Sequence, residues 1–374
     1  MAIKKRVLLL SATLLVSLTL GGCTKEEVQE RLVPWVTENF GEEAGEVIAA
    51  FQSEEKEAEE AVLIPPIDTS VKIHPGAHIA VVSKATKGEF WAALQLGMKD
   101  AIKDINEAYG FSKEDQLTMN FEGTNKEGDV NTQVNILDAV ISENPDVLCL
   151  SASDMDSCVA QLEAAQENGI PVVAFDTNVS QTELVTAFRA SDNVAIGRLA
   201  GLRLAAAMGK MGKVAVFSAQ GKSQSIQDRV KGFSEAIQPY GDIELLEVVF
   251  MDEVADMEAA MQEVLHKYPE LTGVFCTNAD VADLYLNMKK DETLSSVAMV
   301  GVDATVRQQE AVKNYEEVGI VSQSPYAIGY QTIWAAAQCT VSKKKRDVEA
   351  EILLECVWID QDNVSDPEME KYLY

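Results

Sequence analysis

The sequence is poor in the residues that build metal centres and disulfide frameworks. It holds three histidines and six cysteines among 374 residues. The histidines form no ligand cluster and no CxxC spacing occurs, so we expect neither a metal site nor a disulfide framework. Cys149 and Cys276 lie inside apolar runs, which predicts buried thiols. Cys339 and Cys356 stay open as a candidate pair, although one follows a predicted helix and the other lies in a predicted strand.

Positive charge is scarce as well. There are 31 Lys and Arg against 60 Asp and Glu, which gives a formal net charge of -29. Little here can neutralise phosphates, so a nucleic-acid partner is excluded. Such a charge is typical of a surface protein whose copies repel one another, and we expect a monomer. The hydrophobic content of 47% is enough for proper cores, and the length favours two domains.

Motifs of catalysis are also missing. No nucleophile elbow and no Ser/His/Asp set is recognisable. Gly221-Lys222-Ser223 lacks the upstream glycine of a phosphate loop, because Val216 stands at that position. We therefore expect a binding protein without a cofactor. A glycosidase that uses Asp176 and Asp303 as its carboxylate pair is the enzyme alternative, and it is disfavoured because nothing supplies a separate substrate groove.

The N-terminus carries a targeting signal rather than a bilayer-spanning helix. Three cations at positions 4–6 precede the apolar run Val7–Leu20, which is too short to span a bilayer comfortably. The following Leu-Gly-Gly-Cys, ending at Cys23, resembles the bacterial lipoprotein box, which is cut before a cysteine that is then diacylated. We expect residues 1–22 to be the signal peptide and Cys23 the lipidation site, with two chains for stable anchoring. An uncleaved anchor with an incidental cysteine is the alternative.

Residues 23–75 are expected to be an acidic tether. This stretch is rich in Glu, and two short helical patterns in it are interrupted or ended by Pro34, Gly41 and Pro65-Pro66. The simplest interpretation is a solvated spacer that holds the rest of the chain off the membrane. A docking segment for a partner is the alternative.

From His78 onward, apolar strands alternate with helical segments, which is typical of βαβ units with parallel sheets. Ten strands are too many for one open sheet of ordinary size, which again favours two domains. The strands are predicted near 77–83, 116–122, 146–151, 171–175, 184–189, 213–218, 244–250, 273–277, 297–302 and 318–323. The helices are predicted at 89–109, 127–143, 157–168, 193–209, 223–239, 254–268, 279–290, 305–314 and 325–342.

Polar residues end several of the predicted strands. The run Gly169–Asp176 is apolar until it stops at a carboxylate, and the same pattern recurs at Asp303 and, with an amide, at Asn278. Open α/β sheets bind ligands at the carboxyl ends of their strands. A single such Asp is more often a helix cap, but several in one chain favour a polar cleft.

Two further segments have both a structural and a functional interpretation. Phe90 and Trp91 open a helix side by side, where only one can point at the core. Either both rings are packed, or at least one covers the apolar face of a sugar ring in the cleft. Arg229 lies on the second turn of a helix and is either a surface charge or a fork for two hydroxyls. In a third segment, Asp192 or Ser191 is expected to cap the helix that follows, with contact to a ligand as the alternative.

Taken together, these segments resemble the ribose/galactose-type periplasmic binding proteins, the type I sugar-binding proteins of ABC transporters. The resemblance covers about 77–360 and rests on the order and spacing of short motifs. These are Phe90-Trp91, GIPVVAFD ending at Asp176, ASDN at 190–193, Arg229 before Gly232-Phe233, TNAD at 277–280, VGVD at 300–303 and VSQSP at 321–325. It implies two Rossmann-like α/β lobes with parallel sheets, joined by a three-crossing hinge, with the ligand clamped between them.

The resemblance also implies where the lobes and the pocket lie. The N-terminal lobe would comprise residues 76–191 plus 325–352, and the C-terminal lobe residues 192–324 plus 353–374. The crossings would fall near Ser191–Asn193, Gln323–Pro325 and Leu353–Leu354. The implied pocket residues are Phe90 and Trp91 for stacking, with Asp176, Arg229, Asn278, Asp303 and Gln323 for holding hydroxyls.

Three departures from the ribose-type pattern concern the ligand. Gly88-Glu89 stands where that pattern has Asn-Pro, Thr177 where it has an Arg, and Asp252 where an aromatic closes the far lobe. The pocket is therefore expected to be more polar than a ribose site. This favours a ligand other than ribose, either cationic or more heavily hydroxylated.

The resulting hypothesis is a lipid-anchored solute-binding protein on the extracytoplasmic face of a bacterial cell membrane. It would capture a small sugar, most simply a monosaccharide, and deliver it to the permease subunits of an ABC transporter. The alternative is a ligand sensor that passes the closed state to a membrane signalling receptor.

Overall fold

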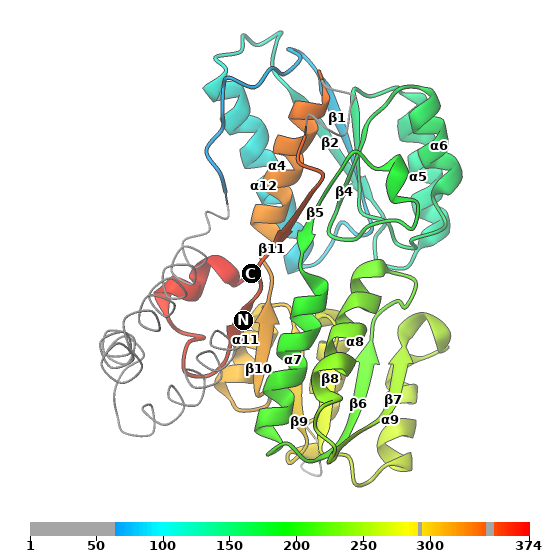
Figure 1. Ribbon diagram of the computed structural model, residues 1–374, viewed down its shortest axis with the longest axis vertical. Helices are drawn as coiled ribbons and strands as arrows, with labels where there is room; N and C mark the ends of the chain where they lie inside the picture. The colour runs from blue at the N-terminus through cyan, green and yellow to red at the C-terminus, as the bar shows by residue number, and fades with distance from the viewer. Residues whose placement is uncertain (1–63, 291–293, 342–347) are drawn as a thin grey trace, which may run out of the picture. The chain divides into compact units, whose positions relative to one another are not determined.

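The computed structural model describes residues 64–290, 294–341 and 348–374. The expected signal peptide, Cys23 and the tether up to residue 63 lie outside this part of the chain. Residues Ile64–Tyr374 form one compact unit, which contains two six-stranded sheets with helices packed against them (Figure 1). We call each sheet with its helices a lobe. The expected α/β class with two lobes is confirmed.

The first lobe is built on a fully parallel sheet with the order β11-β5-β4-β3-β1-β2. Its strands are β1 (His78–Ser83), β2 (Thr118–Gly123), β3 (Val147–Leu150), β4 (Val172–Phe175), β5 (Ala187–Ser191) and β11 (Glu351–Leu354). Its helices are α4 (Glu89–Ala108), α5 (Val130–Ser142), α6 (Val159–Glu167) and α12 (Pro325–Cys339). A 3-10 turn, η1 (Thr182–Leu184), precedes β5.

The second lobe has the sheet order β12-β10-β9-β8-β6-β7, in which only β12 runs antiparallel to its neighbour. Its strands are β6 (Gly212–Ser218), β7 (Ile243–Phe250), β8 (Gly273–Cys276), β9 (Ala298–Val302), β10 (Gly319–Ser322) and β12 (Val357–Ile359). Its helices are α7 (Asn193–Ala207), α8 (Gln224–Ile237), α9 (Met257–Lys267), α10 (Ala279–Met288) and α11 (Val306–Lys313). The 3-10 turns η2 (Met251–Glu253) and η5 (Pro367–Tyr372) complete it.

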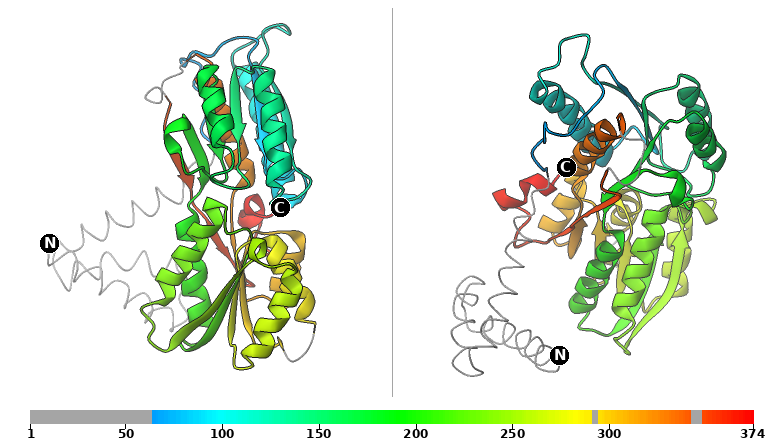
Figure 2. Two further views of the ribbon diagram at one scale, coloured as in Figure 1. Left: turned by 90° about the vertical axis from the view of Figure 1, so that its right-hand side faces the viewer. Right: turned by 45° about the horizontal axis from the view of Figure 1, so that its top comes forward.

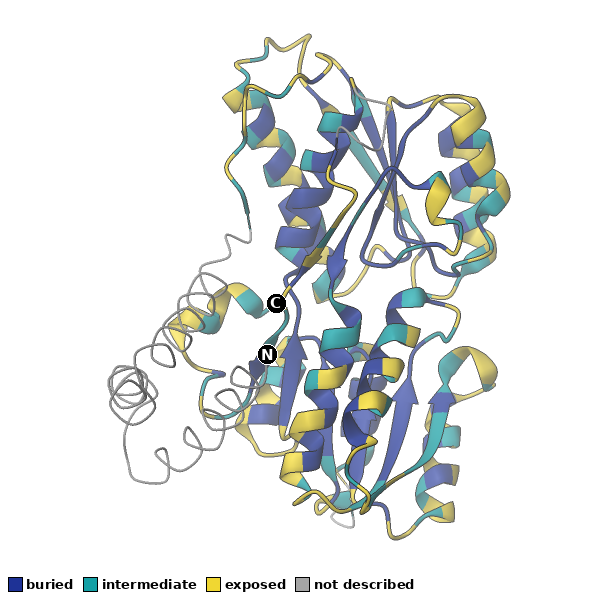
Figure 3. Ribbon diagram, in the orientation of Figure 1, coloured by how far each residue is buried: buried dark blue, intermediate teal, exposed yellow. Residues whose placement is uncertain are grey.

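The strands follow the expectation for sheets covered on both faces. Central strands such as β3, β4 and β8 are buried along their whole length, as the dark ribbons of Figure 3 show. Helices pack on both sides of each sheet, which the turned views of Figure 2 display. Continuous apolar strands therefore form the core, and the polar residues after them are left at the strand ends.

Close packing of α7 on α8 fixes one wall of the later site. Gly197 and Gly232 lie at this contact, and a Cβ at either position would overlap a backbone carbonyl of the facing helix, that of Arg229 or Val194. The absence of side chains lets the two helices approach closely. As expected, Asp192 caps α7, since its Oδ1 accepts a hydrogen bond of 2.9 Å from the Ala195 amide.

The chain passes between the two sheets three times. It leaves the first sheet after β5, returns after β10 to form α12, and crosses again between β11 and β12. The third crossing lies between Leu354 and Val357, slightly later than the expected Leu353–Leu354, because β11 pairs with β5 through Leu354. β11 and β12 were absent from the strands expected from the sequence.

The chain from Asp68 onward is attached to the first lobe, although residues up to 75 were expected to belong to the tether. The Tyr109 hydroxyl donates to the carbonyl oxygens of Asp68 and Val71 at 3.1 and 2.6 Å. The His74 amide donates to Thr340 Oγ1 at 2.8 Å, and Ile73 is buried. Any spacer to the membrane would therefore end before Asp68.

Two further features of the described residues bear on the expectations. The cysteines at 149, 158, 276, 339 and 356 are free thiols, so Cys339 and Cys356 do not pair. No described helix has both the length and the apolar character needed to cross a bilayer.

Candidate functional site

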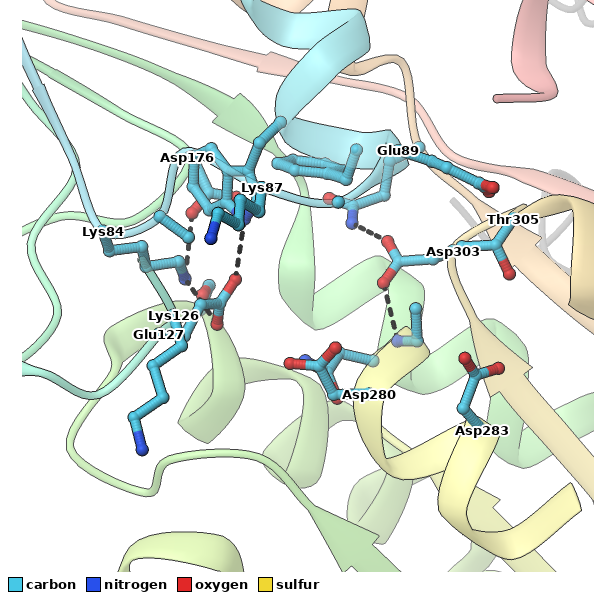
Figure 4. A pocket seen from close by; sticks show the side chains of 18 of the residues that line it. Lys84, Lys87, Glu89, Lys126, Glu127, Asp176, Asp280, Asp283, Asp303 and Thr305 are labelled. Atoms are coloured by element: carbon cyan, nitrogen blue, oxygen red, sulfur yellow. Dashed lines mark hydrogen bonds and ion pairs between the residues drawn. The ribbon is translucent and has the colours of Figure 1, made fainter. Parts of the chain in front are cut away.

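A pocket of about 400 Å³ lies between the carboxyl ends of the two sheets and takes its walls from both lobes (Figure 4). This volume falls within the roughly 300–1,000 Å³ of small-molecule sites. The structure brings all seven residues expected from the sequence to this one cavity: Phe90, Trp91, Asp176, Arg229, Asn278, Asp303 and Gln323.

On the first lobe, Asp176 is held by a buried lysine. Lys84 follows β1 and Asp176 follows β4, and Lys84 Nζ lies 3.0 Å from Asp176 Oδ2. The Ser151 hydroxyl donates to the same oxygen at 3.2 Å. Asp176 is therefore not the helix cap that a lone strand-end Asp most often is. Its φ of 62° is left-handed, which is uncommon for a residue with a Cβ and is frequent at binding sites.

Glu127 connects this pair to the aromatic residues. Its Oε1 accepts a 3.1 Å hydrogen bond from Trp91 Nε1, and its Oε2 lies 3.9 Å from Lys84 Nζ. Burial raises the pKa of Glu127 above its usual value, Lys84 opposes this, and nearby carboxylates add to it. Burial would by itself lower the pKa of Lys84, but Asp176 and Glu127 outweigh burial and raise it. Lys84 is thus held in its charged form.

The aromatic pair opens α4 at the edge of the pocket. Trp91 is buried and Phe90 is half-buried, and their rings meet edge to face with centroids 5.1 Å apart. Phe90 makes a second such contact, at 6.0 Å, with Tyr374. Because Trp91 is fixed by Glu127 and packing, Phe90 is the ring with more surface left for a ligand.

On the second lobe, Asp303 follows β9 and receives three hydrogen bonds, all from neutral donors. Its Oδ2 accepts from the Ala279 amide at 2.9 Å. Its Oδ1 accepts from Gln323 Nε2 at 2.7 Å and from the Tyr374 hydroxyl at 2.9 Å. Gln323 Oε1 in turn accepts from Ser191 Oγ at 3.0 Å, so two crossing segments are tied to this carboxylate. Gln323 acts by positioning Asp303.

Arg229 is buried, so the interpretation as a surface charge is wrong. Its Nε donates to Asn193 Oδ1 at 2.8 Å and its Nη1 to the Thr277 carbonyl at 2.7 Å. Its Nη2 has no hydrogen-bond partner among the described residues. Asn278 caps α10, with its Oδ1 accepting from the Val281 amide at 3.2 Å. These contacts leave one guanidinium edge and one side-chain amide as donors toward the cavity.

Sequence reasoning missed several charged residues that line the pocket. The principal ones are Lys84, Glu127 and Asp280. Lys84 follows an apolar strand as Asp176 does, and this signal was available. Asp252, by contrast, is not among the lining residues; its Oδ1 accepts a 2.7 Å hydrogen bond from the Gly221 amide. The polarity expected from Asp252 comes instead from these three residues.

The two lobes touch across the pocket, where side chains of the first lobe accept hydrogen bonds from first-turn amides of two helices of the second lobe. Thr177 Oγ1 accepts from the Ser225 amide in the first turn of α8 at 3.2 Å. Glu89 Oε2 accepts from the Val306 amide, the first residue of α11, at 2.9 Å. The lobes are therefore in a closed arrangement. No group of three or more His, Cys, Asp or Glu in the described ranges is placed to hold a metal ion.

Two α/β lobes joined by three crossings, with a polar cavity at the facing strand ends, define a two-lobe solute-binding fold. The comparison with protein families agrees. Residues 79–344 match the family described as periplasmic binding protein domain, and the chain belongs to that family. The expectation of a binding protein rather than an enzyme is confirmed by this membership.

Similar proteins fall in the same class. The ribose import binding protein of Escherichia coli K12 is 25% identical over 199 residues, covering 53% of this chain and 67% of that protein. Its namesake in Bacillus subtilis 168 is 24% identical over 230 residues, covering 61% and 74%. An ABC transporter solute-binding protein from Agrobacterium vitis with bound D-fucose has a TM-score of 0.72 and 27% identity, and the match covers 79% of this chain and all of that one. A second from the same organism, bound to α-D-tagatopyranose, has a TM-score of 0.72 and 26% identity, with 80% and 99% covered.

Proposed function

We propose that the protein captures a monosaccharide-like solute outside the cytoplasm and delivers it to an ABC transporter permease. The observation that carries this proposal is the single cavity that gathers an accessible aromatic ring, carboxylates, a guanidinium edge and an amide from two lobes. A sugar hydroxyl both donates and accepts, so this mixture satisfies it. Among the similar proteins, one is named for ribose and two solved structures hold a bound sugar, which supports the same class of ligand here.

The affinity of such a site is adequate for transport. Hydrogen bonds to charged groups contribute roughly 1.5–3 kcal/mol each. A few of them with stacking on Phe90 give micromolar binding, about -8 kcal/mol, after the ordering costs. A ligand that bridges both lobes binds the closed form better, and it therefore shifts the population toward closure. The permease would then recognise the closed form.

Anchoring is the second element of the proposal. Cys23 would carry the lipid after removal of residues 1–22, and the chain up to about residue 67 would space the lobes from the extracytoplasmic face of the membrane. A Cys23→Ser variant is expected to move from the membrane fraction to the soluble fraction and to lose labelling by a clickable fatty acid. Retention and labelling of that variant would contradict the assignment.

The test of binding is calorimetric titration of the full-length protein with a panel of neutral pentoses and hexoses. We expect micromolar binding of at least one sugar, lowered tenfold or more by Asp176→Asn or Arg229→Met, since tenfold corresponds to about 1.4 kcal/mol. Arg198→Met is the matched control, because Arg198 is a half-exposed arginine of the same lobe, paired with Glu235 at 3.6 Å away from the pocket. Absence of binding for every sugar, charged or neutral, would refute the proposal.

A further inference from the structure

Six carboxylates and five cations line the pocket, and the charges are not evenly paired across it. Asp176, Asp280 and Asp303 each raise the pKa of Glu127 by charge repulsion, after the larger effect of burial. Among the described residues, Lys84 is the one cation that forms an ion pair with any of them, and it contacts Asp176 and Glu127. The carboxylates of the second lobe, Asp280 and Asp303, have no ion pair there.

Asp280 is a pocket carboxylate that receives neither a hydrogen bond nor an ion pair from the described residues. It lies in the first turn of α10, and Figure 4 shows its side chain projecting into the cavity. No described residue donates a hydrogen bond to it, whereas Asp303 receives three from neutral groups. Although Asp280 is exposed, partial loss of its hydration and then repulsion from Asp303 raise its pKa, and Lys84 opposes them only in part. The arrangement places an unpaired acceptor beside a second carboxylate.

The other cations of the described pocket lining, Lys87, Lys126, Arg229 and Arg307, form no ion pair with Asp280 or Asp303. Arg229 directs Nε and Nη1 to Asn193 and Thr277. Arg307 lies 3.4 Å from Asp283 and donates to Asn287 at 3.0 Å. No cation and no hydrogen-bond donor of the described residues contacts the exposed Asp280 side chain, so a ligand that brings positive charge to this wall gains a charge-assisted hydrogen bond there. Sugar phosphates and sugar acids would be repelled by it.

We infer that the ligand is a cationic relative of a monosaccharide, an amino sugar, whose ammonium group lies against Asp280 and Asp303. This inference rests on the proposed function and narrows its ligand class. The hydroxyls of the sugar are held by the Asp176 side of the pocket and its ring by Phe90. The ammonium supplies three donors and a full positive charge, whereas the described protein groups give Asp280 neither a donor nor an ion pair and give Asp303 neutral donors only.

The experiment compares matched sugars on the full-length protein by calorimetric titration. D-Galactose and D-glucose are each set against the 2-amino sugar and its uncharged N-acetyl derivative. We expect the amino sugar of at least one series to bind tenfold or more tightly than both neutral forms. That preference is expected to weaken with added salt and on acidification, because screening and protonation of Asp280 both remove the attraction.

The variant Asp280→Asn keeps the shape of the side chain and removes its charge. It is expected to abolish the preference while neutral sugars still bind, which also shows that the variant is folded. Glu263→Gln, an exposed carboxylate of α9 in the same lobe, is expected to keep the preference. The inference is overturned if neutral sugars bind as well as amino sugars, or if Asp280→Asn retains the preference. Failure of all sugars to bind would instead overturn the proposed function and this inference with it.

Discussion

Lys84 Nζ lies 3.0 Å from Asp176 Oδ2, although 92 positions separate the two residues in the chain. The sheet order explains the meeting, because β3 is the only strand between β1 and β4 and all three run parallel. Both side chains are buried. Lys84 also approaches Glu127, so one cation supports two carboxylates and, through Glu127, the orientation of Trp91.

Removing the Lys84 charge should therefore destabilise the protein. Breaking a buried ion pair by deleting one partner costs about 3–5 kcal/mol, because the other charge stays buried. We expect Lys84→Met to lower the free energy of unfolding by about that amount in urea titrations at neutral pH. The raised pKa of Lys84 means that its contribution is present below the unfolded-state pKa and is lost only as the pH rises through the higher folded-state pKa.

The double variant Lys84→Met with Asp176→Asn tests whether the loss of stability comes from the unpaired carboxylate of Asp176. Replacing both charges is expected to recover part of the loss, since no unpaired carboxylate is left at position 176. Additive losses from the two substitutions would show that the ion pair is not the source of the stability. Lys103→Met, which alters an exposed lysine of α4, is the matched control and should change little.

The fold was largely predictable because its signals are local. Ten strands and nine helices were predicted, each from an apolar run or a helical periodicity within its own short segment of sequence. β11 and β12 were missed because four and three residues are too short for such a pattern. Their pairing with β5 and β10 depends on distant parts of the chain.

The site was predictable only in part, for a physical reason. Asp176, Asn278 and Asp303 end buried strands, and topology places such residues at one edge of a sheet. Glu127 follows the edge strand β2 in a loop, and its reach to Trp91 and Lys84 is a tertiary contact without a local pattern. Asp280 lies in a first helical turn, where a carboxylate is expected for stability alone. Its lack of a partner is visible only in three dimensions.

Thr177 is expected to stabilise the closed form. It stands where the ribose-type pattern has an arginine, and its hydroxyl accepts from the Ser225 amide of the other lobe and lies 3.3 Å from Ser223 Oγ. Thr177→Val keeps the shape and removes about 0.5–1.5 kcal/mol of hydrogen bonding. We expect a roughly twofold to tenfold weaker affinity for the sugar that the wild type binds, with faster dissociation, because fewer molecules are closed.

The control for Thr177 is Thr132→Val on α5, an exposed threonine outside the pocket. Fluorescence energy transfer between labels on the two lobes should show a smaller closed fraction in Thr177→Val at a given sugar concentration. An unchanged closed fraction together with an unchanged affinity would contradict the role given to this hydroxyl.

Tyr374 is expected to fix the position of Asp303. Its hydroxyl donates to Asp303 Oδ1 at 2.9 Å, and its ring contacts Phe90, so it touches groups from both lobes. Tyr374→Phe should weaken sugar binding several-fold through the lost hydrogen bond. Tyr374→Ala should weaken it further, because the aromatic contact contributes about 0.5–1.5 kcal/mol more. Tyr315→Phe, at an exposed tyrosine, is the control, and equal affinities for all three variants and the wild type would refute the role.

Glu317 gives the second lobe an unusual dependence of stability on pH. It is buried beside Gly301 and Gln308, and neither carboxylate oxygen has a hydrogen-bond partner among the described residues. Burial raises the pKa of Glu317 well above its usual value, Lys289 opposes the rise, and Asp283 adds to it. The folded state therefore holds this proton more tightly than the unfolded state does.

The higher folded-state pKa of Glu317 determines how the free energy of unfolding changes with pH. The free energy of unfolding should fall as the pH rises from the unfolded-state pKa toward the higher folded-state pKa, by up to about 1.4 kcal/mol per pH unit from this group. Glu317→Gln cannot ionise, so it should remove that slope and be more stable than the wild type at the alkaline end of the window. Urea titrations at several pH values between the unfolded-state and folded-state pKa measure both the slope and the difference in stability between Glu317→Gln and the wild type. Glu316→Gln, at the exposed neighbouring residue, should leave the slope unchanged, and parallel curves for Glu317→Gln and the wild type would show that Glu317 does not titrate in this way.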